Sequence, residues 1–377
     1  MIAIYRKYRP KNLSEMLGQE AVSEIIKNAA RLDRLSHAYL FYGPKGSGKT
    51  TTARILAKIA NCEKRQQDEK FKKLGEPCNQ CRSCLEIDKG LAMDVIEIDA
   101  ASNRGIDEIR NLKESIRVSP SSSFYKIYII DETHQLTKDA FNALLKTLEE
   151  PPAHAIIILV TTEIEKMPAT IVSRTQRFHF KRLPLKIIIE KLKSIAKEEK
   201  IKISDKAIEL IASSAGGSFR DAESLLDQMA SFKIDEKSKT KTIDIENVEK
   251  ILGQVAFIRT SELAEFLIKN NLSAALEFLS SINENGYNLV QFCYDLIHYF
   301  RKVLSLKFSP DLEKHFSREM TDQELNIIKK HSKLIDSSKE TEKIIKLIKS
   351  LIQAYTEMRY SPFTLVPLEV AIIESLK

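Results

Sequence analysis

A glycine-rich run fits the pattern G-x-x-x-x-G-K-[ST], in which backbone N–H groups cradle the phosphates of a nucleoside triphosphate. In this pattern Lys49 reaches the β- and γ-phosphates, and the Thr50 hydroxyl binds Mg²⁺. An apolar run precedes the glycines and an amphipathic stretch follows them, which favours this prediction over a glycine-rich turn that binds nothing. The predicted nucleotide-binding residues of the loop are Gly43, Pro44, Lys45, Gly46, Ser47, Gly48, Lys49, Thr50 and Thr51.

Two adjacent carboxylates, Asp131 and Glu132, follow the apolar run Lys126–Ile130. Downstream of a phosphate loop, such an aspartate binds Mg²⁺ and the glutamate orients and polarises the attacking water. The alternative is a helix that begins with acidic residues. His134 follows closely, and no other ligand-spaced histidine accompanies it, so we interpret it as part of a structural or polar network rather than as a metal ligand.

Four of the five cysteines have the spacing C-x15-C-x2-C-x2-C, at Cys62, Cys78, Cys81 and Cys84. Four thiolates complete a tetrahedral zinc site and leave no ligand position open, so the predicted site is structural. Four reduced thiols without a metal are the alternative. We expect the site to hold a surface hairpin, and the stretch Glu63–Leu74 between the first two cysteines is polar and lysine-rich. Cys293 lies in an apolar helical stretch and is predicted to be buried.

Strands and helices must position these residues, and the hydrophobic pattern predicts both. Nearly continuous apolar runs are typical of parallel strands that are covered on both faces. Between them, Thr51–Ala60 and Ala140–Leu148 repeat apolar residues on one face, and Pro151 and Pro152 stop the second of these helices. The pattern predicts a doubly wound α/β domain. Its predicted strands are His37–Tyr42, Asp94–Asp99, Lys126–Ile130, Ala155–Thr161 and Arg177–Phe180.

Beyond Leu183 and Pro184 the strand signals fade, and the pattern is helical to the end. A polar, lysine-rich linker, Ser231–Thr242, divides this helical region. We predict an α/β domain over residues 1–182 with a zinc module at about 62–84, a helical domain and linker over 183–242, and an all-α domain over 243–377. The predicted helices of the last two parts are Ile187–Ile195, Ile208–Ala215, Arg220–Ala230, Leu263–Ile268, Ala274–Ile282, Leu289–Leu304 and Lys343–Met358.

Composition sets broad limits on function. The 377 residues are 43% hydrophobic and 29% charged, which is ordinary for a globular protein, and the net charge of +7 permits nucleic-acid binding without requiring it. No apolar stretch reaches the ~20 residues that cross a bilayer, and the basic start Met1–Lys11 is not followed by the apolar run of a signal peptide. We therefore expect a cytoplasmic protein with reduced cysteines and no membrane partner.

Several long segments resemble the gamma/tau subunit family of bacterial DNA polymerase III, the ATPases of the replicative sliding-clamp loader. The longest is Asp131–Pro152, and Tyr5–Lys11, Gly18–Glu20 and Glu97–Arg110 are similar to other parts of that family. The resemblance covers residues 5 to about 232, whereas the last part matches only in being helical and of suitable length. It implies an AAA+ P-loop NTPase domain with an inserted zinc module, a small helical lid and a helical collar that holds a five-membered spiral together.

The resemblance also implies roles for residues beyond the phosphate loop. Thr161 and Thr162 match sensor 1, which reports on the γ-phosphate. Ser173 and Arg174 match a motif whose arginine reaches into a neighbouring subunit's ATP site, although Thr175 stands where the family has cysteine. A surface salt bridge is the alternative for the arginine.

Two further segments complete the implied nucleotide site. Arg220, within Gly217–Asp221, matches sensor 2, which contacts phosphate in cis. Tyr8, Arg9 and Pro10 correspond to the N-terminal segment of the family that lies near the adenine. The catalytic residues that we expect are Lys49, Asp131, Glu132, Thr162, Arg174 and Arg220.

The implied function is that of an ATP-hydrolysing motor within the DNA polymerase III holoenzyme, which opens the clamp and loads it on primed DNA during replication. The implied cofactors are ATP, Mg²⁺ and Zn²⁺. The implied partners are the delta and delta-prime subunits, further copies of this chain, the clamp, and primed DNA through its backbone. Arg104 and Arg110 are candidates for phosphate contacts, with solvated helix-end charges as the alternative.

Two other functions stay open. Asp131–His134 also resembles the signature of DExH helicases, but a single phosphate-loop domain disfavours the helicases with two such domains. A non-catalytic scaffold like the delta-prime subunit is the second alternative. That subunit lacks a working phosphate loop, so the presence of Lys49, Thr50, Asp131 and Glu132 argues against it.

Overall fold

Five apolar segments pair into one parallel sheet with the order β2-β3-β4-β1-β5. The computed structural model describes residues 3–102, 114–231, 242–252, 257–317 and 319–376. Each strand begins and ends within one residue of its predicted bounds, so the predicted parallel α/β fold is confirmed for this part of the chain. The strands are β1 (Ala38–Tyr42), β2 (Val95–Asp99), β3 (Lys126–Asp131), β4 (Ala155–Thr161) and β5 (Gln176–His179).

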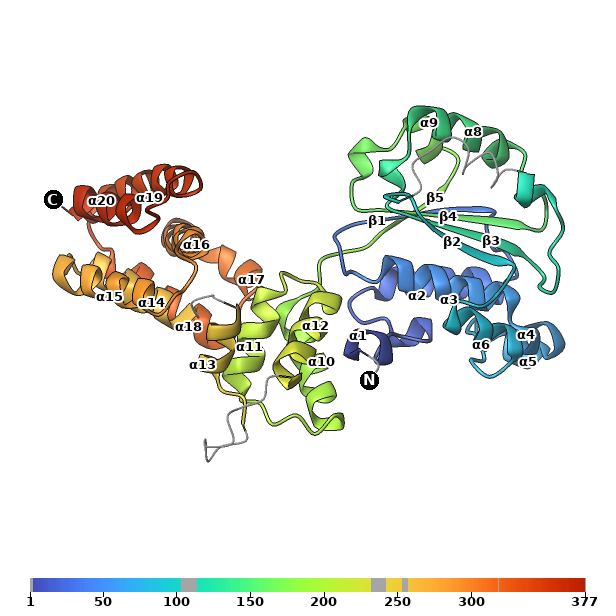
Figure 1. Cartoon of the computed structure of the whole chain (residues 1–377), viewed down its shortest axis with the longest axis horizontal. Helices are drawn as coiled ribbons and strands as arrows, with labels where there is room; N and C mark the ends of the chain where they lie inside the picture. The colour runs from blue at the N-terminus through green and yellow to red at the C-terminus, as the bar shows by residue number, and fades with distance from the viewer. Residues whose placement is uncertain (1–2, 103–113, 232–241, 253–256, 318, 377) are drawn as a thin grey trace. The chain divides into compact units, whose positions relative to one another are not determined.

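Helices cover both faces of this sheet (Figure 1). On one face α2 (Glu20–Arg31) and α3 (Lys49–Asn61) pack against Ile127 and Ile129 of β3. On the opposite face α8 (Lys138–Glu149) and α9 (Ala169–Val172) pack against the side chains that alternate with these, such as Tyr128. Because both faces are covered, the central strands are apolar along their whole length.

The parallel register brings three strand ends to one edge of the sheet. Tyr42 of β1 pairs with Thr161 of β4, and Ile130 of β3 pairs with Leu159 of β4. The loops that follow β1, β3 and β4 therefore leave the sheet side by side, and in open parallel sheets this carboxyl edge is where ligands bind. The phosphate loop follows β1, and the two predicted carboxylates lie at the end of β3.

The segment that carries four cysteines is helical, and the predicted surface hairpin was wrong. The segment forms α4 (Glu63–Gln67), α5 (Glu69–Lys72) and α6 (Arg82–Lys89). Asp68 begins α5 by accepting hydrogen bonds from the backbone N–H groups of Lys70 and Phe71. The buried Arg65 donates to the carbonyl oxygens of Ile59 and Ala30, near the ends of α3 and α2. The stretch is thus anchored to the sheet-covering helices.

The other regular elements of the described residues are helices. The amino-terminal elements are α1 (Ile4–Lys7) and a 3-10 turn, η1 (Leu13–Glu15). Cys293 is fully buried in the core that α14 to α20 share, as predicted. Most of the predicted linker, Ser231–Thr242, lies outside the described residues. The later helices are α10 (Leu185–Glu198), α11 (Asp205–Ser214), α12 (Phe219–Ser231), α13 (Ile245–Leu252), α14 (Phe257–Ile268), α15 (Leu272–Glu284), α16 (Leu289–Phe308), α17 (Glu313–Phe316), α18 (Asp322–Leu334), α19 (Ser338–Met358) and α20 (Leu365–Leu376).

The chain divides into two compact units. The first consists of Met1–Leu183 with Gly217–Asp221, and the second of Pro184–Gly216 with Ala222–Lys377. The three-part division stays a prediction. Among the described residues, no helix combines the length and the apolar character that a membrane span needs.

Candidate functional site

The phosphate loop joins β1 to α3 in a conformation that needs glycine. Gly46 has φ of 71°, and a Cβ atom there would lie 1.8 Å from Ser218 Oγ. Gly43 has φ of 142°, and a Cβ atom there would lie 2.1 Å from the carbonyl oxygen of Phe180. Side chains at either position would be both strained and obstructed. The loop is thus packed tightly against Ser218 and the residue that follows β5.

Lys49 is the buried cation of this loop. Its side chain is 6% exposed, and its Nζ donates to the carbonyl oxygens of Gly43 and Pro44, both at 2.8 Å. Burial lowers the pKa of Lys49, while the nearby charges of Asp131 and Glu132 oppose that shift. The hydrogen-bond acceptors of this ammonium group are therefore neutral carbonyls of its own loop, and a charged phosphate oxygen is a stronger acceptor than these.

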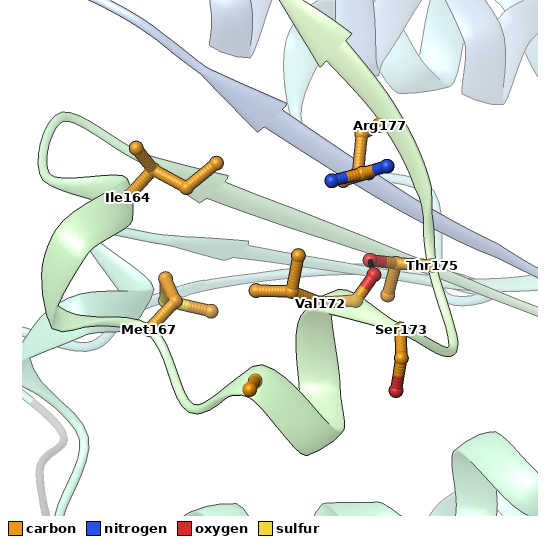
Figure 2. A pocket seen from close by; sticks show the side chains of 7 residues that line it. Ile164, Met167, Val172, Ser173, Thr175 and Arg177 are labelled. Carbon is orange, nitrogen blue, oxygen red and sulfur yellow. Dashed lines mark hydrogen bonds between the residues drawn. The ribbon is translucent and has the colours of Figure 1, made fainter.

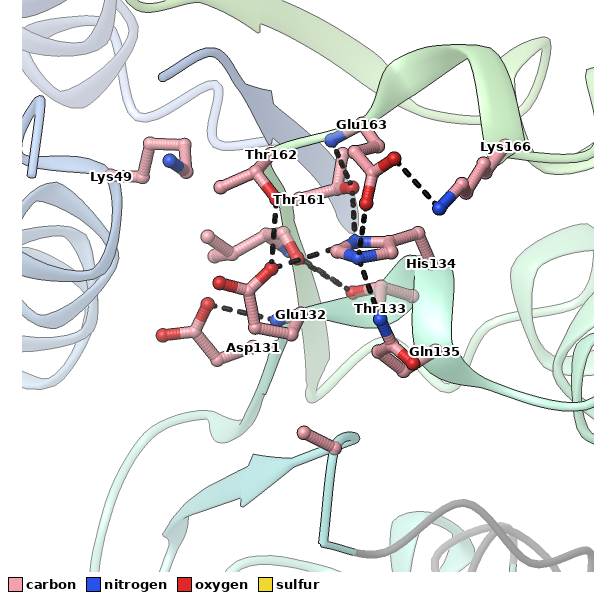
Figure 3. Close-up of polar contacts among 12 residues, drawn as sticks. Lys49, Asp131, Glu132, Thr133, His134, Gln135, Thr161, Thr162, Glu163 and Lys166 are labelled. Atoms are coloured by element: carbon pink, nitrogen blue, oxygen red, sulfur yellow. Dashed lines mark hydrogen bonds and ion pairs between the residues drawn. The ribbon is translucent and has the colours of Figure 1, made fainter. Parts of the chain in front are cut away.

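The carboxyl edge of the sheet brings together Thr50, Asp131, Glu132 and Thr162. Thr50 Oγ1 donates to Asp131 Oδ2 at 2.7 Å. The Thr162 hydroxyl donates to Glu132 Oε2 at 3.1 Å, as Figure 3 shows. Glu132 has φ of 48°, in the left-handed region that residues with a side chain seldom occupy. Such backbone strain concentrates at functional sites. The predicted Mg²⁺ ligands thus touch each other, as do the predicted base and sensor.

His134 lies beside the carboxylate of Glu132, in the 3-10 turn η2 (Thr133–Gln135). Its ring is 4% exposed, with Nδ1 at 3.0 Å from Thr161 Oγ1 and 3.5 Å from Glu132 Oε2. Its Nε2 lies 3.1 Å from Glu163 Oε1. The interpretation of His134 as a member of a polar network is confirmed.

Gln19 is a site residue that the sequence prediction missed. It is buried, and its amide nitrogen donates to the carbonyl oxygens of Lys181, at 2.8 Å, and Ser47, at 3.4 Å. Its amide oxygen accepts from the backbone N–H of Lys181 at 3.1 Å. Gln19 therefore ties the phosphate loop to the chain that follows β5. The segment Gly18–Glu20 already resembled the family, which was the available signal.

Arginines gather around the amino-terminal segment that precedes α2. The Arg220 guanidinium lies 5.4 Å from the centre of the Tyr5 ring. Burial lowers the pKa of the half-buried Arg9, and the positive charges of Arg54 and Arg220 lower it further. Arg54, on α3, donates to both carboxylate oxygens of Glu97, each at 2.8 Å. These cations form a positive region to which α3 and the start of α12 both contribute.

Tyr8 and Pro10 flank Arg9 just after α1. Both are partly buried, and the Lys7 ammonium lies 5.6 Å from the centre of the Tyr8 ring. An aromatic face and a proline beside arginines suit a flat, electron-rich group.

Arg174 lies on the surface, two residues after α9. Its side chain is 36% exposed and pairs with Glu149 Oε1 at 2.7 Å, and it donates to the carbonyl oxygen of Thr170 at 2.9 Å. These contacts, like its contact with Ser173, lie on its own surface rather than at the carboxyl edge of the sheet. Beside it lies a cavity of about 480 Å³, shown in Figure 2, which is lined by Ile164, Met167, Ala169, Val172, Ser173, Thr175 and Arg177.

The four clustered cysteines have a geometry that suits one metal ion. The sulfur atoms of Cys62, Cys78, Cys81 and Cys84 all lie within 4.8 Å of one another. A tetrahedral zinc ion with Zn–S bonds of about 2.3 Å separates its sulfur ligands by about 3.8 Å. The hydrogen bond from the Cys84 thiol lowers the pKa of Cys62. The backbone N–H of Cys78 donates to Cys62 Sγ at 3.4 Å and lowers its pKa further. The backbone N–H of Cys81 donates to Cys78 Sγ at 3.2 Å, while burial raises the pKa of Cys78 overall.

The cysteine segment is joined to the phosphate-loop helix by buried polar contacts. Lys58 of α3 is 1% exposed, and its Nζ lies 2.7 Å from Asn79 Oδ1 and 2.9 Å from Asp88 Oδ1. The same ammonium group donates to the carbonyl oxygen of Lys11 at 3.0 Å. The Glu76 carboxylate accepts from the backbone N–H groups at the start of η1, at 2.9 and 3.0 Å. One cation thus holds α3, the cysteine segment and the amino-terminal segment together.

Comparison with known proteins assigns the chain to a family. Residues 18–184 match the family described as DNA polymerase III, delta subunit, and residues 187–232 match the DNA polymerase III clamp loader subunit, ATPase lid domain. Residues 243–376 match DNA polymerase III subunits gamma and tau domain III. The DNA polymerase III subunit gamma of Buchnera aphidicola subsp. Schizaphis graminum is 33% identical, over 98% of this chain and 97% of its own length. The chain belongs to the gamma/tau family of DNA polymerase III subunits.

Longer members of the gamma/tau family are also similar. The Bacillus subtilis subunit tau is 40% identical over 99% of this chain, which spans 62% of that protein. The Escherichia coli subunit tau is 36% identical over 81% of this chain and 45% of its own length. A solved Thermotoga maritima RuvB branch migration motor covers 72% of this chain at 20% identity with a TM-score of 0.46, which is too low to bear on the assignment. The predicted resemblance is confirmed, with a lid domain and a helical domain III after the parallel sheet.

Proposed function

We propose that this chain is the ATP-hydrolysing motor subunit of a sliding-clamp loader, which opens the clamp and loads it on primed DNA during replication. The observation that carries the proposal is the meeting of Lys49, Thr50, Asp131 and Glu132 at one edge of the sheet, in a member of the gamma/tau family. A subunit that serves only as a scaffold does not require these four residues, because it hydrolyses no ATP. The fold that we propose for this unit is that of an AAA+ ATPase.

The phosphate loop and Asp131 are proposed to bind ATP with Mg²⁺. The buried ammonium group of Lys49 has neutral acceptors that a phosphate can replace, and three glycines of the loop have the positive φ that lets backbone N–H groups turn toward a phosphate. The Thr50 hydroxyl and the Asp131 carboxylate, already in contact, suit a hard cation that prefers oxygen ligands. Mg²⁺ supplies positive charge against the β- and γ-phosphates.

Glu132 and Thr162 are proposed to act on the attacking water. The Glu132 carboxylate orients the water and accepts its proton, and the Thr162 hydroxyl holds one carboxylate oxygen in place. The strained backbone at Glu132 supports this assignment, because a residue with no role there would be expected to relax.

The two arginines are proposed to act on different ATP sites, Arg220 on the site of its own chain and Arg174 on that of a neighbouring subunit. Arg220 contacts phosphate in cis, which is supported by the position of Ser218, two residues earlier, against Gly46. Arg174 reaches into the ATP site of a neighbouring subunit, which is supported by its exposure on the surface. Tyr8, Arg9 and Pro10 are proposed to lie beside the adenine.

The four-cysteine cluster is proposed to bind one structural zinc ion. We expect Cys84→Ser to lower the zinc content from about one ion per chain to near zero and to lower Tm, because the buried Cys84 supplies one of four ligands. Metal analysis by mass spectrometry and a thermal melt measure both effects. Cys293→Ser is the matched control, since Cys293 is equally buried and lies outside the cluster. Full zinc content in Cys84→Ser, or none in the wild type, contradicts the site.

Each of the three predicted domains is proposed to have its own role. Residues 1–182 bind the nucleotide, residues 183–242 form a lid, and residues 243–377 form a collar. The collar is proposed to bind delta, delta-prime and further copies of this chain. Support comes from large apolar side chains that α19, α20 and the turn between them leave exposed, namely Ile352, Tyr360, Phe363, Val366 and Val370. DNA is proposed to bind through its backbone, and the candidate residues Arg104 and Arg110 lie outside the described residues.

The test is ATP hydrolysis by this chain with its delta and delta-prime partners. We expect clamp and primed DNA together to stimulate the rate strongly, and Lys49→Ala to abolish that stimulation and clamp loading. Stimulation by DNA alone favours a translocase. Clamp loading that survives Lys49→Ala favours the scaffold alternative.

A further inference from the structure

Outside the roles proposed above, one buried side chain touches the proposed base. We infer that His134 is a positioning residue for Glu132, which holds the carboxylate through the ring nitrogen Nδ1 in the orientation that activates water. The inference rests on the proposed function, because it concerns the step that Glu132 performs. It assigns to His134 no contact with nucleotide or metal.

The geometry places the His134 ring beside one oxygen of the Glu132 carboxylate. Nδ1 lies 3.5 Å from Glu132 Oε2, the same oxygen to which the Thr162 hydroxyl donates at 3.1 Å. A separation of 3.5 Å is longer than a direct hydrogen bond, so the contact acts through charge and dipole rather than through a shared proton. Figure 3 shows the carboxylate between these two groups. The other carboxylate oxygen of Glu132, Oε1, is then the one that orients the attacking water.

A held carboxylate matters at this position because the rest of the residue restrains it little. Glu132 has a side chain that is 37% exposed, at the end of a strand and on a strained backbone. An exposed glutamate side chain has several rotamers, and only a narrow range of them orients a water molecule along the line of attack. Contacts on one oxygen reduce this freedom without neutralising the base.

The surroundings of His134 fix the ring itself. Nε2 lies 3.1 Å from Glu163 Oε1, and Gln135 Nε2 lies 3.0 Å from the same nitrogen. Glu163 Oε2 in turn pairs with Lys166 at 2.7 Å. The Gln135 amide nitrogen can only donate, so Nε2 can accept from it, and in that tautomer the ring carries its N–H on Nδ1. The ring thus presents a hydrogen on Nδ1 toward Thr161 and Glu132.

This arrangement differs from that of a buried histidine that only fills space. The 4% exposed ring has polar neighbours at both nitrogens, and two of these neighbours are carboxylates on different segments of the chain. The second carboxylate, Glu163, comes directly before the turn η3 (Ile164–Lys166), and Ile164 lines the cavity beside Arg174. His134 therefore connects the base to the segment that leads into the turn η3.

Two substitutions separate positioning from packing. In His134→Asn the side-chain amide nitrogen takes the place of Nδ1. In His134→Gln the side-chain amide nitrogen takes the place of Nε2. We expect His134→Gln to lower kcat on the order of 10-fold or more in the assembled complex, and His134→Asn to retain more of the wild-type kcat. Both variants should keep the wild-type KM for ATP, because the phosphate loop is untouched. If His134 only fills space, the order reverses, since glutamine is closer to histidine in volume.

A second measurement does not depend on hydrolysis. In nucleotide-free protein, Glu132→Gln should shift the ¹⁵N resonance of His134 Nδ1 more than that of Nε2, and Glu163→Gln should do the opposite. His154→Asn is the control for loss of a histidine in the same unit, because His154 contacts the backbone carbonyl of Ile116 and lies outside the network. It should leave kcat unchanged.

Equal kcat in the wild type and both His134 variants, or unshifted ring resonances, overturns the inference while the wild type still hydrolyses ATP. Absence of Lys49-dependent hydrolysis in the wild type instead overturns the proposed function. The two failures are therefore distinguishable.

Discussion

Arg174→Ala should lower the ATPase rate of the assembled complex by roughly 10³-fold or more, the scale on which an arginine supplied in trans accelerates related GTPases. Nucleotide binding by the isolated chain should not change, because Arg174 pairs with Glu149 and Thr170 on its own surface. Steady-state hydrolysis with the delta and delta-prime partners, beside a fluorescent-nucleotide titration of the chain alone, measures the two quantities.

The pair with Glu149 must open before Arg174 can reach a neighbour, and exposed pairs of this kind contribute only about 1 kcal/mol or less. Glu149→Gln should therefore leave hydrolysis at or slightly above the wild-type rate. Arg177→Ala is the charge-matched control, because Arg177 is an exposed arginine three residues further along the chain. An equal loss in both arginine variants, or full activity in a monomer, speaks against a trans-acting Arg174.

Glu132→Gln should lower kcat by roughly 10²- to 10⁴-fold, the usual contribution of a positioned general base. The amide still fills the space beside Thr162 but accepts protons poorly, so ATP binding should persist while its hydrolysis slows by that factor. Single-turnover hydrolysis and nucleotide affinity, measured on the same complex, separate the two steps.

Glu165→Gln serves as the control for Glu132→Gln, because Glu165 is exposed in the turn η3. It should behave as the wild type. If Glu132→Gln hydrolyses ATP within a few-fold of the wild type, another residue activates the water.

Local patterns predicted the parts of the site that lie on continuous segments. The glycine spacing before Lys49 and the acidic pair after β3 are each contained in fewer than ten residues, and the apolar runs gave the strands within one residue. Because parallel strands end at a shared edge, the meeting of Thr50 with Asp131 followed from the fold class. The roles of Arg174 and Arg220 needed the family resemblance, since an isolated arginine has no pattern of its own.

What the sequence could not predict are contacts between distant, ordinary residues. Gln19 binds a backbone segment 162 positions away, and Ser218 packs on Gly46 from a similar separation. Arg65 belongs to a polar, lysine-rich stretch, yet its guanidinium is buried against two carbonyl oxygens at helix ends. Such carbonyl oxygens lack a donor within their own helices. The amino-acid composition does not indicate which side chain supplies that donor.

The contacts of the Lys58 ammonium group bear on how ligand binding at two places in the first unit is linked. It fixes the cysteine segment, the amino-terminal segment and the phosphate-loop helix to one another. A metal ion at the cysteines and a nucleotide at the loop would then order overlapping parts of the chain. By linkage, whatever factor the metal adds to nucleotide affinity, the nucleotide must add to metal affinity. If both ligands bind, the cysteine cluster and the phosphate loop form one linked pair of sites, in which each ligand changes the affinity for the other by the same factor.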